Sequence, residues 1–415
     1  MEHVKFSVRN VRLRGIFALL GVLALVITGS VRVVHAAGEI KVGLVVGLTG
    51  GASAWGKRAW NTYQMIFDEL NEKGGIKSMG GAKIKYRVMD HQTKPEIAGN
   101  NTERLIRDGV RVIFGANSSD NAMVASQVCQ RAKIPFIDTT DGDPMITERG
   151  FDYVFRVNPH NRMLCTGALK TAQWLETKKK FKKVAILSGQ TSFGYSSYKI
   201  YEEILPPHYD VVFKETYPVA QQDFTGIVSK MKKAGVELVF QTANPADAIL
   251  ITRAYKELDF NPMGYMGTIG GHYVMDYIEA LGKDADYTLC SNWFTSDLKV
   301  PLIKELMARY KQKYGIEFDA TDATVCCAIS VLVDALERAG RDDPAKLRDA
   351  IKATDLDVGK YWYIIPDGCK FDKNNQNIKQ KTIAFQIRDG KWKAVYPENY
   401  SSIKVGFPFP EWGKR

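Results

Sequence analysis

A glycine-rich segment near the start of the chain has residue types that can hold a phosphate. Residues 51–58 read G-A-S-A-W-G-K-R, and the first seven match the G-x-x-x-x-G-K start of a phosphate-binding loop. In such a loop a Ser or Thr follows the lysine, because its hydroxyl ligates the magnesium ion. Here Arg58 follows the lysine, and the bulky Trp55 lies between the glycines. The segment therefore does not predict a nucleotide site, and we expect no cofactor.

The spacings that mark common hydrolytic and metal sites do not occur in the sequence. It contains neither H-E-x-x-H, a zinc-binding helix pattern, nor G-x-S-x-G, the turn that carries a nucleophilic serine. Its six cysteines include no C-x-x-C pair, and their pairing cannot be read from spacing alone. We therefore expect no catalytic residue, no metal site and no enzyme. A hydrolase stays open as an alternative, because a triad assembled in space leaves no fixed spacing.

The N-terminal residues have the order of a secretory signal peptide. Residues 1–14 are basic, residues 15–30 (GIFALLGVLALVITGS) are uncharged and mostly apolar, and a small residue, Ala36, follows. The apolar run is shorter than the roughly 20 residues of a membrane-spanning helix. We expect residues 1–36 to be a signal peptide cleaved near Ala36, and the mature protein to be exported to the periplasm.

Charge and composition also exclude a class of partner. Part of the formal net charge of +11 lies in the signal peptide, and the other basic residues are scattered along the chain. Nucleic-acid binding would need a basic stripe with aromatic residues or a known module, so we expect no nucleic acid. Hydrophobic residues make up 45% of the chain, which is enough for packed cores. At roughly 100–200 residues per domain, the length suggests two domains.

Short apolar strands alternate with amphipathic helices after the leader. Strands are expected at 40–46, 84–89, 110–114, 134–138, 183–187, 211–215, 236–241 and 264–267. Helices are expected at 58–73, 96–108, 119–131, 195–205, 224–234, 245–258, 300–314 and 321–339. Two runs of this alternation predict an α/β fold with two doubly wound parallel-sheet lobes. Ligands bind outside the carboxyl ends of such strands, so we expect the site in the cleft between the lobes. Trp55, on the loop between the first strand and helix, should lie on the cleft rim.

Several of these segments resemble one known family. They are IKVGLVVGLTGGASAWG, FDELNEKGGI, VMDHQTKPEIA, VIFGANSSDNAMVASQV, IPFIDTTDGDP, VAILSGQTSFGYSSY and QQDFTGIVSKMKKAGVELVF, in family order. The chain resembles the leucine/isoleucine/valine-binding family of periplasmic proteins that serve ABC transporters. The resemblance implies lobes that close over a ligand about a hinge of three crossovers. The crossovers would fall near Asn158, near 292–294 and near 358–367, which gives lobes of 39–158 plus 294–358 and of 159–292 plus 359–415.

The resemblance also implies which residues of the first lobe bind a ligand. Ser119, with Ser118 as its neighbour, corresponds to the serine that receives the ligand's carboxylate at a helix start, where free N–H groups favour an anion. Thr140 corresponds to a contact in a second carboxylate-binding loop. Gly142 stands where the family has a threonine, and Asp141 beside it could accept a ligand's ammonium or amide, or could only serve the loop.

The second lobe departs more from the family. Phe193 stands where the family has a tyrosine, and Trp293 could add to an aromatic slot. Amino-acid binders of the family hold the ammonium with a Glu, but the corresponding segment, residues 267–272, reads G-T-I-G-G-H. The expected ligand-binding residues are Trp55, Ser118, Ser119, Thr140, Asp141, Gly142, Phe193 and Trp293.

The missing acid bears on the ligand, because an ammonium buried without an anionic partner is costly. The resemblance implies a monomeric solute-binding protein that delivers a small ligand to a membrane permease. That ligand is an amino acid, an aromatic carboxylate or an amide. A soluble periplasmic sensor of the same fold is the open alternative, and an exported hydrolase is another. The identity of the ligand, its affinity and the permease are not contained in the sequence.

Overall fold

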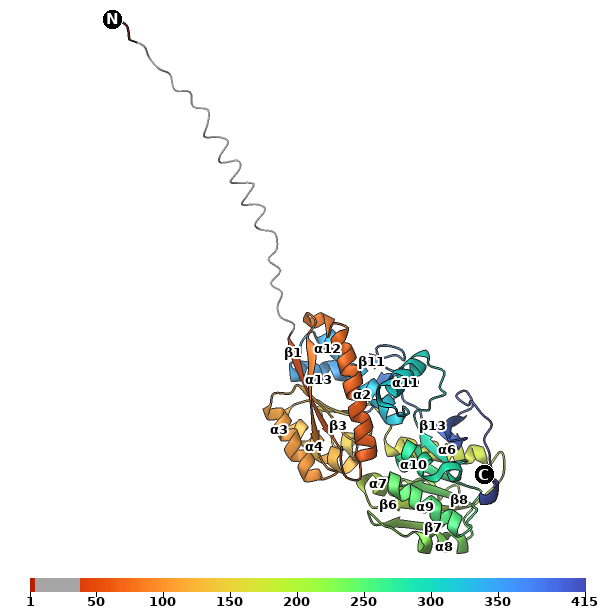
Figure 1. Ribbon diagram of the computed structural model, residues 1–415. Helices are drawn as coiled ribbons and strands as arrows, with labels where there is room; N and C mark the ends of the chain where they lie inside the picture. The colour runs from red at the N-terminus through yellow and green to blue at the C-terminus, as the bar shows by residue number, and fades with distance from the viewer. Residues whose placement is uncertain (4–37) are drawn as a thin grey trace.

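The computed structural model describes residues 1–3 and 38–415. The expected cleavage site near Ala36, and almost all of the expected signal peptide, lie outside these residues. The described part forms two lobes, each built around one large β-sheet (Figure 1). None of its helices is both long and apolar enough to cross a bilayer.

The first lobe contains a sheet of five parallel strands in the order β2-β1-β3-β4-β5. Its strands are β1 (Glu39–Val46), β2 (Lys83–Asp90), β3 (Val112–Ala116), β4 (Phe136–Asp138) and β5 (Val154–Arg156). Helices cover both faces, so β1 is apolar on both sides: Val42 and Leu44 pack with α2 and α12, whereas Val45 packs with α3 and α4. The helices of this lobe are α2 (Ser53–Glu72), α3 (Pro95–Arg107), α4 (Ser119–Ala132), α5 (Met145–Glu148), α11 (Pro301–Tyr314), α12 (Ala320–Ala339) and α13 (Pro344–Lys352).

The second lobe contains a sheet of seven strands in the order β14-β13-β10-β9-β8-β6-β7. Its strands are β6 (Lys183–Gly189), β7 (Asp210–Tyr217), β8 (Leu238–Thr242), β9 (Gly264–Thr268), β10 (Leu289–Asn292), β13 (Ile383–Arg388) and β14 (Lys391–Tyr396). Its helices are α6 (Asn161–Leu175), α7 (Ser192–Ile204), α8 (Thr225–Lys233), α9 (Pro245–Glu257) and α10 (Met275–Leu281). The predicted parallel α/β architecture is confirmed, and each expected strand and helix is present with small shifts at its ends, apart from the start of α2.

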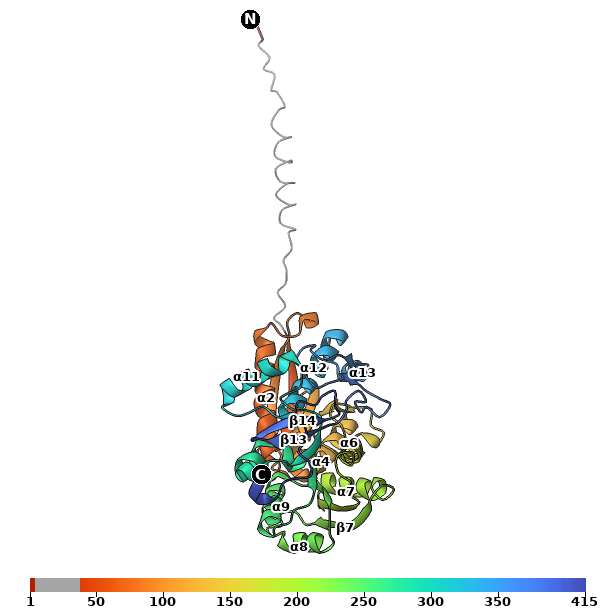
Figure 2. The same ribbon diagram turned by 90° about the vertical axis from the view of Figure 1, so that its right-hand side faces the viewer.

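One part of the second sheet was not predicted. β13 runs antiparallel to β10, and β14 runs antiparallel to β13. The turn between them is Asp389-Gly390, and both residues have positive φ. Asp-Gly at a two-residue hairpin turn is a strong local signal, so the sequence did contain a sign of this hairpin. The C-terminal end of the chain lies in the second lobe (Figures 1 and 2). There Trp412 Nε1 donates to the carbonyl of Phe260 at 2.9 Å.

The glycine-rich segment differs from its prediction. The first helix begins at Ser53 rather than at residue 58, so Trp55 lies in the first turn of α2 and not in a loop. Gly56 explains this, because a Cβ at this position would overlap the carbonyl of Gly47 at the end of β1. The absence of a side chain lets the helix start pack directly on the strand end. The likeness to a phosphate-binding loop thus has a packing reason.

Strand pairing also bears on where the chain passes between the lobes. From β5 the chain enters α6, which packs on β9, β10 and β13. After β10 it returns to the first lobe, where α12 packs on α2. Residues 355–377 then stay with the first lobe, because β11 (Asp355–Leu356) pairs with β12 (Cys369–Lys370) and Gln376 bridges to Arg156. Residues 378–382 then lead to β13 of the second lobe, and the expected crossover at 358–367 stays a prediction.

Candidate functional site

A cavity of about 460 Å³ lies at the carboxyl ends of strands from both sheets. Its residues come from the segments that follow β1, β2, β3 and β4 in the first lobe and β6, β7, β8 and β9 in the second. This is the place where doubly wound sheets bind ligands. Seven expected residues line the cavity: Trp55, Ser118, Ser119, Thr140, Asp141, Gly142 and Phe193.

The eighth expected residue, Trp293, does not line this cavity. Its side chain has no exposed surface, and its Nε1 donates to Thr324 Oγ1 of α12 at 2.8 Å. The indole therefore joins the end of β10 to the first lobe as part of the core. Its expected ligand contact has no support in this geometry, because the ring direction after β10 is set by packing against α12.

Further lining residues were not singled out from the sequence. They are Gly51, Ala52, Gln92, Thr93, Lys94, Pro95, Asn117, Asp120, Thr191, Val219, Asn244, Ile269 and Gly270. Tyr273, which follows the end of β9, lines the cavity as well. Nearly all of them follow the carboxyl end of a parallel strand, so that position was the available signal.

Trp55 and Asp90 shape the rim of the cavity in the first lobe. The indole of Trp55 packs partly against the core, and its Nε1 is buried without a hydrogen-bond partner. Asp90, at the end of β2, accepts hydrogen bonds from the N–H of Leu48 at 2.9 Å, the hydroxyl of Thr49 at 2.7 Å and the N–H of Gln92 at 2.8 Å. Burial opposes ionisation, but these hydrogen bonds lower the pKa of Asp90. The rim loops are thus held by an ionised carboxylate.

The start of α4 provides donors on the cavity wall. Ser118 is the N-cap residue, and its side chain makes no capping hydrogen bond. Ser119 Oγ accepts the N–H of Gly142 at 3.2 Å and the N–H of Asp143 at 3.3 Å. Because both of these bonds use oxygen lone pairs, the hydroxyl hydrogen of Ser119 remains available to an acceptor. A helix start with open N–H groups also favours an anion.

The two acids of the neighbouring loop serve the fold rather than point free into the cavity. Asp141 Oδ2 accepts the N–H of Ala116 at 2.8 Å and of Asn117 at 3.2 Å. Asp143 Oδ1 accepts the N–H of Met145 at 2.9 Å, at the start of α5. Burial raises the pKa of both carboxyls. Of the two roles considered for Asp141, the structure favours the one in the loop.

The wall from the second lobe is mainly apolar. Phe193 lies in the first turn of α7, where Thr191 Oγ1 caps the helix by accepting the N–H of Gly194 at 3.0 Å. Ile269 and Tyr273 are almost fully buried beside it. Among the lining residues that the structure describes, the acidic side chains are Asp120 and Asp141, and both belong to the first lobe.

The two walls touch each other at the edge of the cavity. The N–H of Asn161 donates to the carbonyl of Gly142 at 2.7 Å, and the hydroxyl of Ser192 donates to the carboxylate of Asp120. A Cβ at Gly142 would overlap the side-chain oxygen of Asn161 and contact the ring of Phe193. Glycine at this position therefore allows the close approach of the second lobe.

Other reactive side chains lie away from this site. All six cysteines are buried and unpaired. His272 is fully buried, and neither ring nitrogen has a hydrogen-bond partner; burial lowers the pKa of His272 to about 4. In the described residues, no group of three or more His, Cys, Asp or Glu side chains is placed to hold a metal ion.

Comparison with known proteins agrees with this arrangement. The family described as periplasmic binding protein matches residues 39–391. The Leu/Ile/Val-binding protein homolog 7 of Brucella abortus (strain 2308) is 28% identical over 384 residues, which cover 90% of this chain and 95% of the relative.

Two solved structures share the fold. The branched-chain amino acid transporter substrate-binding protein of Streptococcus pneumoniae in complex with isoleucine has a TM-score of 0.76 and 19% identity, over 86% of this chain and 100% of that one. A solute-binding protein of an ABC transporter from Rhodopseudomonas palustris BisB5, in complex with 3,4-dihydroxybenzoic acid, has a TM-score of 0.75 and 22% identity, over 91% of this chain and 99% of that one. With the family matched over most of its length, the chain belongs to the periplasmic binding proteins.

Proposed function

We propose that this protein is the solute-binding component of an ABC transporter of the branched-chain amino acid type. In the periplasm it captures one small molecule between its lobes and delivers that molecule, as a monomer, to a membrane permease. The observation that carries the proposal is the cavity of about 460 Å³, lined by strand ends of both sheets. Its size is within the roughly 300–1,000 Å³ of small-molecule sites. The family membership and the curated relative support the same function.

The ligand has a carboxylate or amide head and an apolar body. The head lies against the first wall, which is the part of the cavity lining that the first lobe contributes. There the hydroxyl of Ser119 and the start of α4 provide donors. The body lies against the apolar second wall, beside Phe193 and Tyr273. Isoleucine and 3,4-dihydroxybenzoic acid, bound by the two structural neighbours, both carry a carboxylate, the first on an aliphatic body and the second on a dihydroxylated aromatic ring.

The acids of the lining favour a ligand without an ammonium group. An α-amino acid would bury a cation that needs an anionic partner. Oδ2 of Asp141 already accepts two backbone N–H groups, and burial raises the pKa of its carboxyl, which disfavours the charged form. Asp120 and the remaining oxygen of Asp141 are the acidic groups on the lining that could be that partner. An aromatic carboxylate or an amide needs no such partner. We therefore propose aromatic carboxylates and amides as ligands ahead of the branched-chain amino acids.

A thermal-shift panel on refolded, ligand-free protein tests the proposal. The panel contains leucine, isoleucine, valine, benzoate, 3,4-dihydroxybenzoate, benzamide and urea, with benzamide as the neutral match for benzoate. A ligand at 100 times its Kd stabilises the folded state by about 2.7 kcal/mol, which raises the unfolding midpoint by several degrees.

We expect a shift with an aromatic carboxylate or amide that exceeds the shift with leucine. A shift with the amino acids alone would show that the ammonium is accommodated and would reject the proposed ligand class. No shift with any compound of the panel would contradict the proposal of a small carboxylate or amide ligand.

A further inference from the structure

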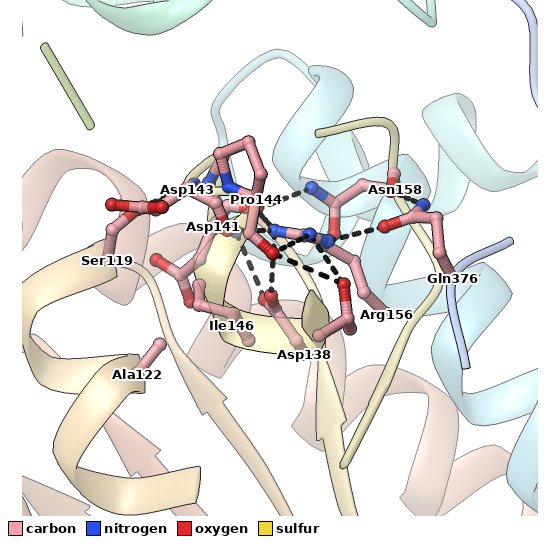
Figure 3. A network of polar contacts seen from close by, with 12 residues as sticks. Ser119, Ala122, Asp138, Asp141, Asp143, Pro144, Ile146, Arg156, Asn158 and Gln376 are labelled. Atoms are coloured by element: carbon pink, nitrogen blue, oxygen red, sulfur yellow. Dashed lines mark hydrogen bonds and ion pairs between the residues drawn. The ribbon is translucent and has the colours of Figure 1, made fainter. Parts of the chain in front are cut away.

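A fully buried arginine lies beneath the first wall of the cavity (Figure 3). Arg156 is the last residue of β5, and its guanidinium faces the 140–144 loop. Its Nη1 donates to the carbonyls of Asp141 at 3.2 Å and Asp143 at 2.6 Å. Its Nη2 donates to the carbonyl of Pro144 at 3.4 Å and to Thr147 Oγ1 at 2.9 Å. One side chain therefore holds three backbone carbonyls of a loop that lines the cavity.

This contact determines which edge of the loop faces the cavity. In a trans peptide the C=O and the N–H point in opposite directions. The carbonyl of Asp141 points to Arg156, so the N–H of Gly142 points the other way, to Ser119 Oγ at 3.2 Å. If the carbonyl edge turned toward the cavity, it would repel a carboxylate. The orientation imposed by Arg156 is the one that an anionic head requires.

The same network reaches the loop that precedes the start of α4. The carboxylate of Asp141 accepts the N–H groups of Ala116 and Asn117, which precede the start of α4. Asp138 pairs with Arg156 at 3.9 Å and accepts the N–H of Asp141 at 3.1 Å. Both loops beside the start of α4 thus rest on one buried cluster.

The network also reaches the ends of the segments that join the lobes. Arg156 Nε donates to Gln376 Oε1 at 2.7 Å, and Gln376 Nε2 donates to the carbonyl of Asn158 at 2.8 Å. Asn158 Nδ2 in turn donates to the carbonyl of Asp141 at 3.0 Å. Asn158 lies between β5 and α6, and Gln376 lies shortly before the chain returns to β13. A change at either joining segment would therefore act on the loop through these bonds.

We propose that Arg156 is a positioning residue that sets the carboxylate preference of the cavity and links it to the movement of the lobes. This inference rests on the proposed function, because it concerns the ligand of that cavity. The guanidinium contributes five donors in a fixed fork, and each one has an acceptor here. A lysine has the same charge but three donors and no fork, so it cannot hold the loop in this way.

The first test needs no ligand. Hydrogen exchange is measured on ligand-free wild type, Arg156→Lys and Arg58→Lys. Arg58 is the matched control, because it is also a buried, ion-paired arginine of the first lobe, 3.1 Å from Asp319, and does not contact the loop. We expect Arg156→Lys to exchange at least tenfold faster over residues 138–147 and 115–121, and Arg58→Lys to exchange there as wild type does. Wild-type protection of both segments in Arg156→Lys would overturn the inference.

A second variant keeps the test decisive if Arg156→Lys does not fold. Gln376→Leu removes the acceptor of Nε and leaves the loop contacts of Arg156 in place. We expect faster exchange in residues 156–160 and a smaller but measurable increase in residues 138–147. Faster exchange confined to the neighbourhood of residue 376 would reject the link between the joining segments and the loop.

The ligand arm compares benzoate with benzamide by calorimetry. We expect Arg156→Lys to lower the ratio of benzoate to benzamide affinity about tenfold, and Arg58→Lys to leave that ratio unchanged. A ratio unchanged in Arg156→Lys would mean that the arginine serves stability alone. If wild type binds neither compound, the proposed ligand class fails, and the exchange experiment still decides the positioning role.

Discussion

The two walls of the cavity differ in how their polar groups are used. The first wall presents a helix start, the hydroxyl of Ser119 and a loop whose carbonyls are turned inward to Arg156. The second wall presents Phe193, Ile269 and Tyr273, and the hydroxyl of Thr191 is already used as a helix cap. Under the proposed function, this difference assigns the charged head of the ligand to the first wall, and its apolar body to the second wall together with Trp55 of the first.

The difference also suggests an order of binding. Polar groups that are fixed in advance cost little to organise when a ligand arrives. The first wall is held by buried hydrogen bonds, so it can bind the head before the lobes close. The second wall then covers the apolar body, and closure buries area that contributes roughly 25 cal/mol per Å².

The largest effect should come from removing the aromatic group of the first wall. We expect Trp55→Ala to weaken binding of the ligand found in the panel by about 2–3 kcal/mol, because large buried aromatic side chains dominate contact energies. The buried indole N–H without a partner is lost with it. Calorimetry measures the change, and circular dichroism checks the fold.

Trp174→Ala is the matched control for this substitution. Trp174 is also partly buried, packs against Tyr396 with the two rings tilted, and lies outside the cavity. It should lower stability without changing affinity. Equal affinity of Trp55→Ala and wild type would break the assignment of Trp55 to the binding wall.

A smaller effect should separate the head of the ligand from its body. We expect Ser119→Ala to weaken benzoate-type ligands by about 1–2 kcal/mol, because it removes a donor to the carboxylate. The matched amide should lose less. Ser126→Ala, on the same helix with its hydroxyl bonded to the carbonyl of Ala122, should change neither. Equal losses for acid and amide would contradict the role of the first wall in binding the charged head.

The segment between β5 and α6 should make the stability of the protein depend on pH. His160 caps α6 by accepting the N–H of Met163 at 3.4 Å. Burial, with the charges of Arg156 and Arg162, lowers the pKa of His160 to about 3. In the unfolded chain His160 takes up a proton below about pH 6.5, whereas in the folded protein it stays neutral. The folded state is therefore destabilised relative to the unfolded state as the pH falls from about 6.5 toward 3.

His160→Asn tests this dependence, because asparagine can also cap a helix. Relative to wild type, the variant should gain about 1–2 kcal/mol of unfolding free energy between pH 7.5 and pH 5. Chemical unfolding at the two pH values measures the difference in unfolding free energy between the variant and wild type. A gap that does not change with pH would show that His160 is not held neutral in the folded protein.

The smallest effect should come from the acid at the edge of the first wall. Asp120 lines the cavity, and its carboxylate accepts the hydroxyl of Ser192. Asp120→Asn keeps an acceptor and removes one negative charge near the expected carboxylate head. We expect aromatic carboxylates to bind about two- to fivefold tighter, a change of roughly 0.4–1 kcal/mol. Tighter binding that persists at high salt, or weaker binding of the carboxylate, would refute this electrostatic explanation.

Much of the fold could be predicted because its signals are local. Alternating apolar strands and amphipathic helices indicated two parallel sheets, and the positions after the strand ends indicated most of the cavity. Ser119 and Phe193 came from the resemblance to the leucine/isoleucine/valine-binding family, and both line the cavity. Trp293 was placed there as well, but its indole packs on α12. The direction of a side chain after a strand depends on the helix that covers it, and that helix is distant in the sequence.

By itself, the sequence determined the α/β class, the two lobes and the edge of each sheet that lines the cavity, because these follow from periodicity and chain order. Only the tertiary structure decided which polar groups are free. Asp141 looked available in the sequence, but its carboxylate is used by the N–H groups of Ala116 and Asn117. Arg156 showed no motif, yet it orients the loop through partners at Asp143 and at Gln376, some 220 residues away. Hydrogen bonds between such distant residues form only when packing brings them together in a dry interior, where each donor must find an acceptor.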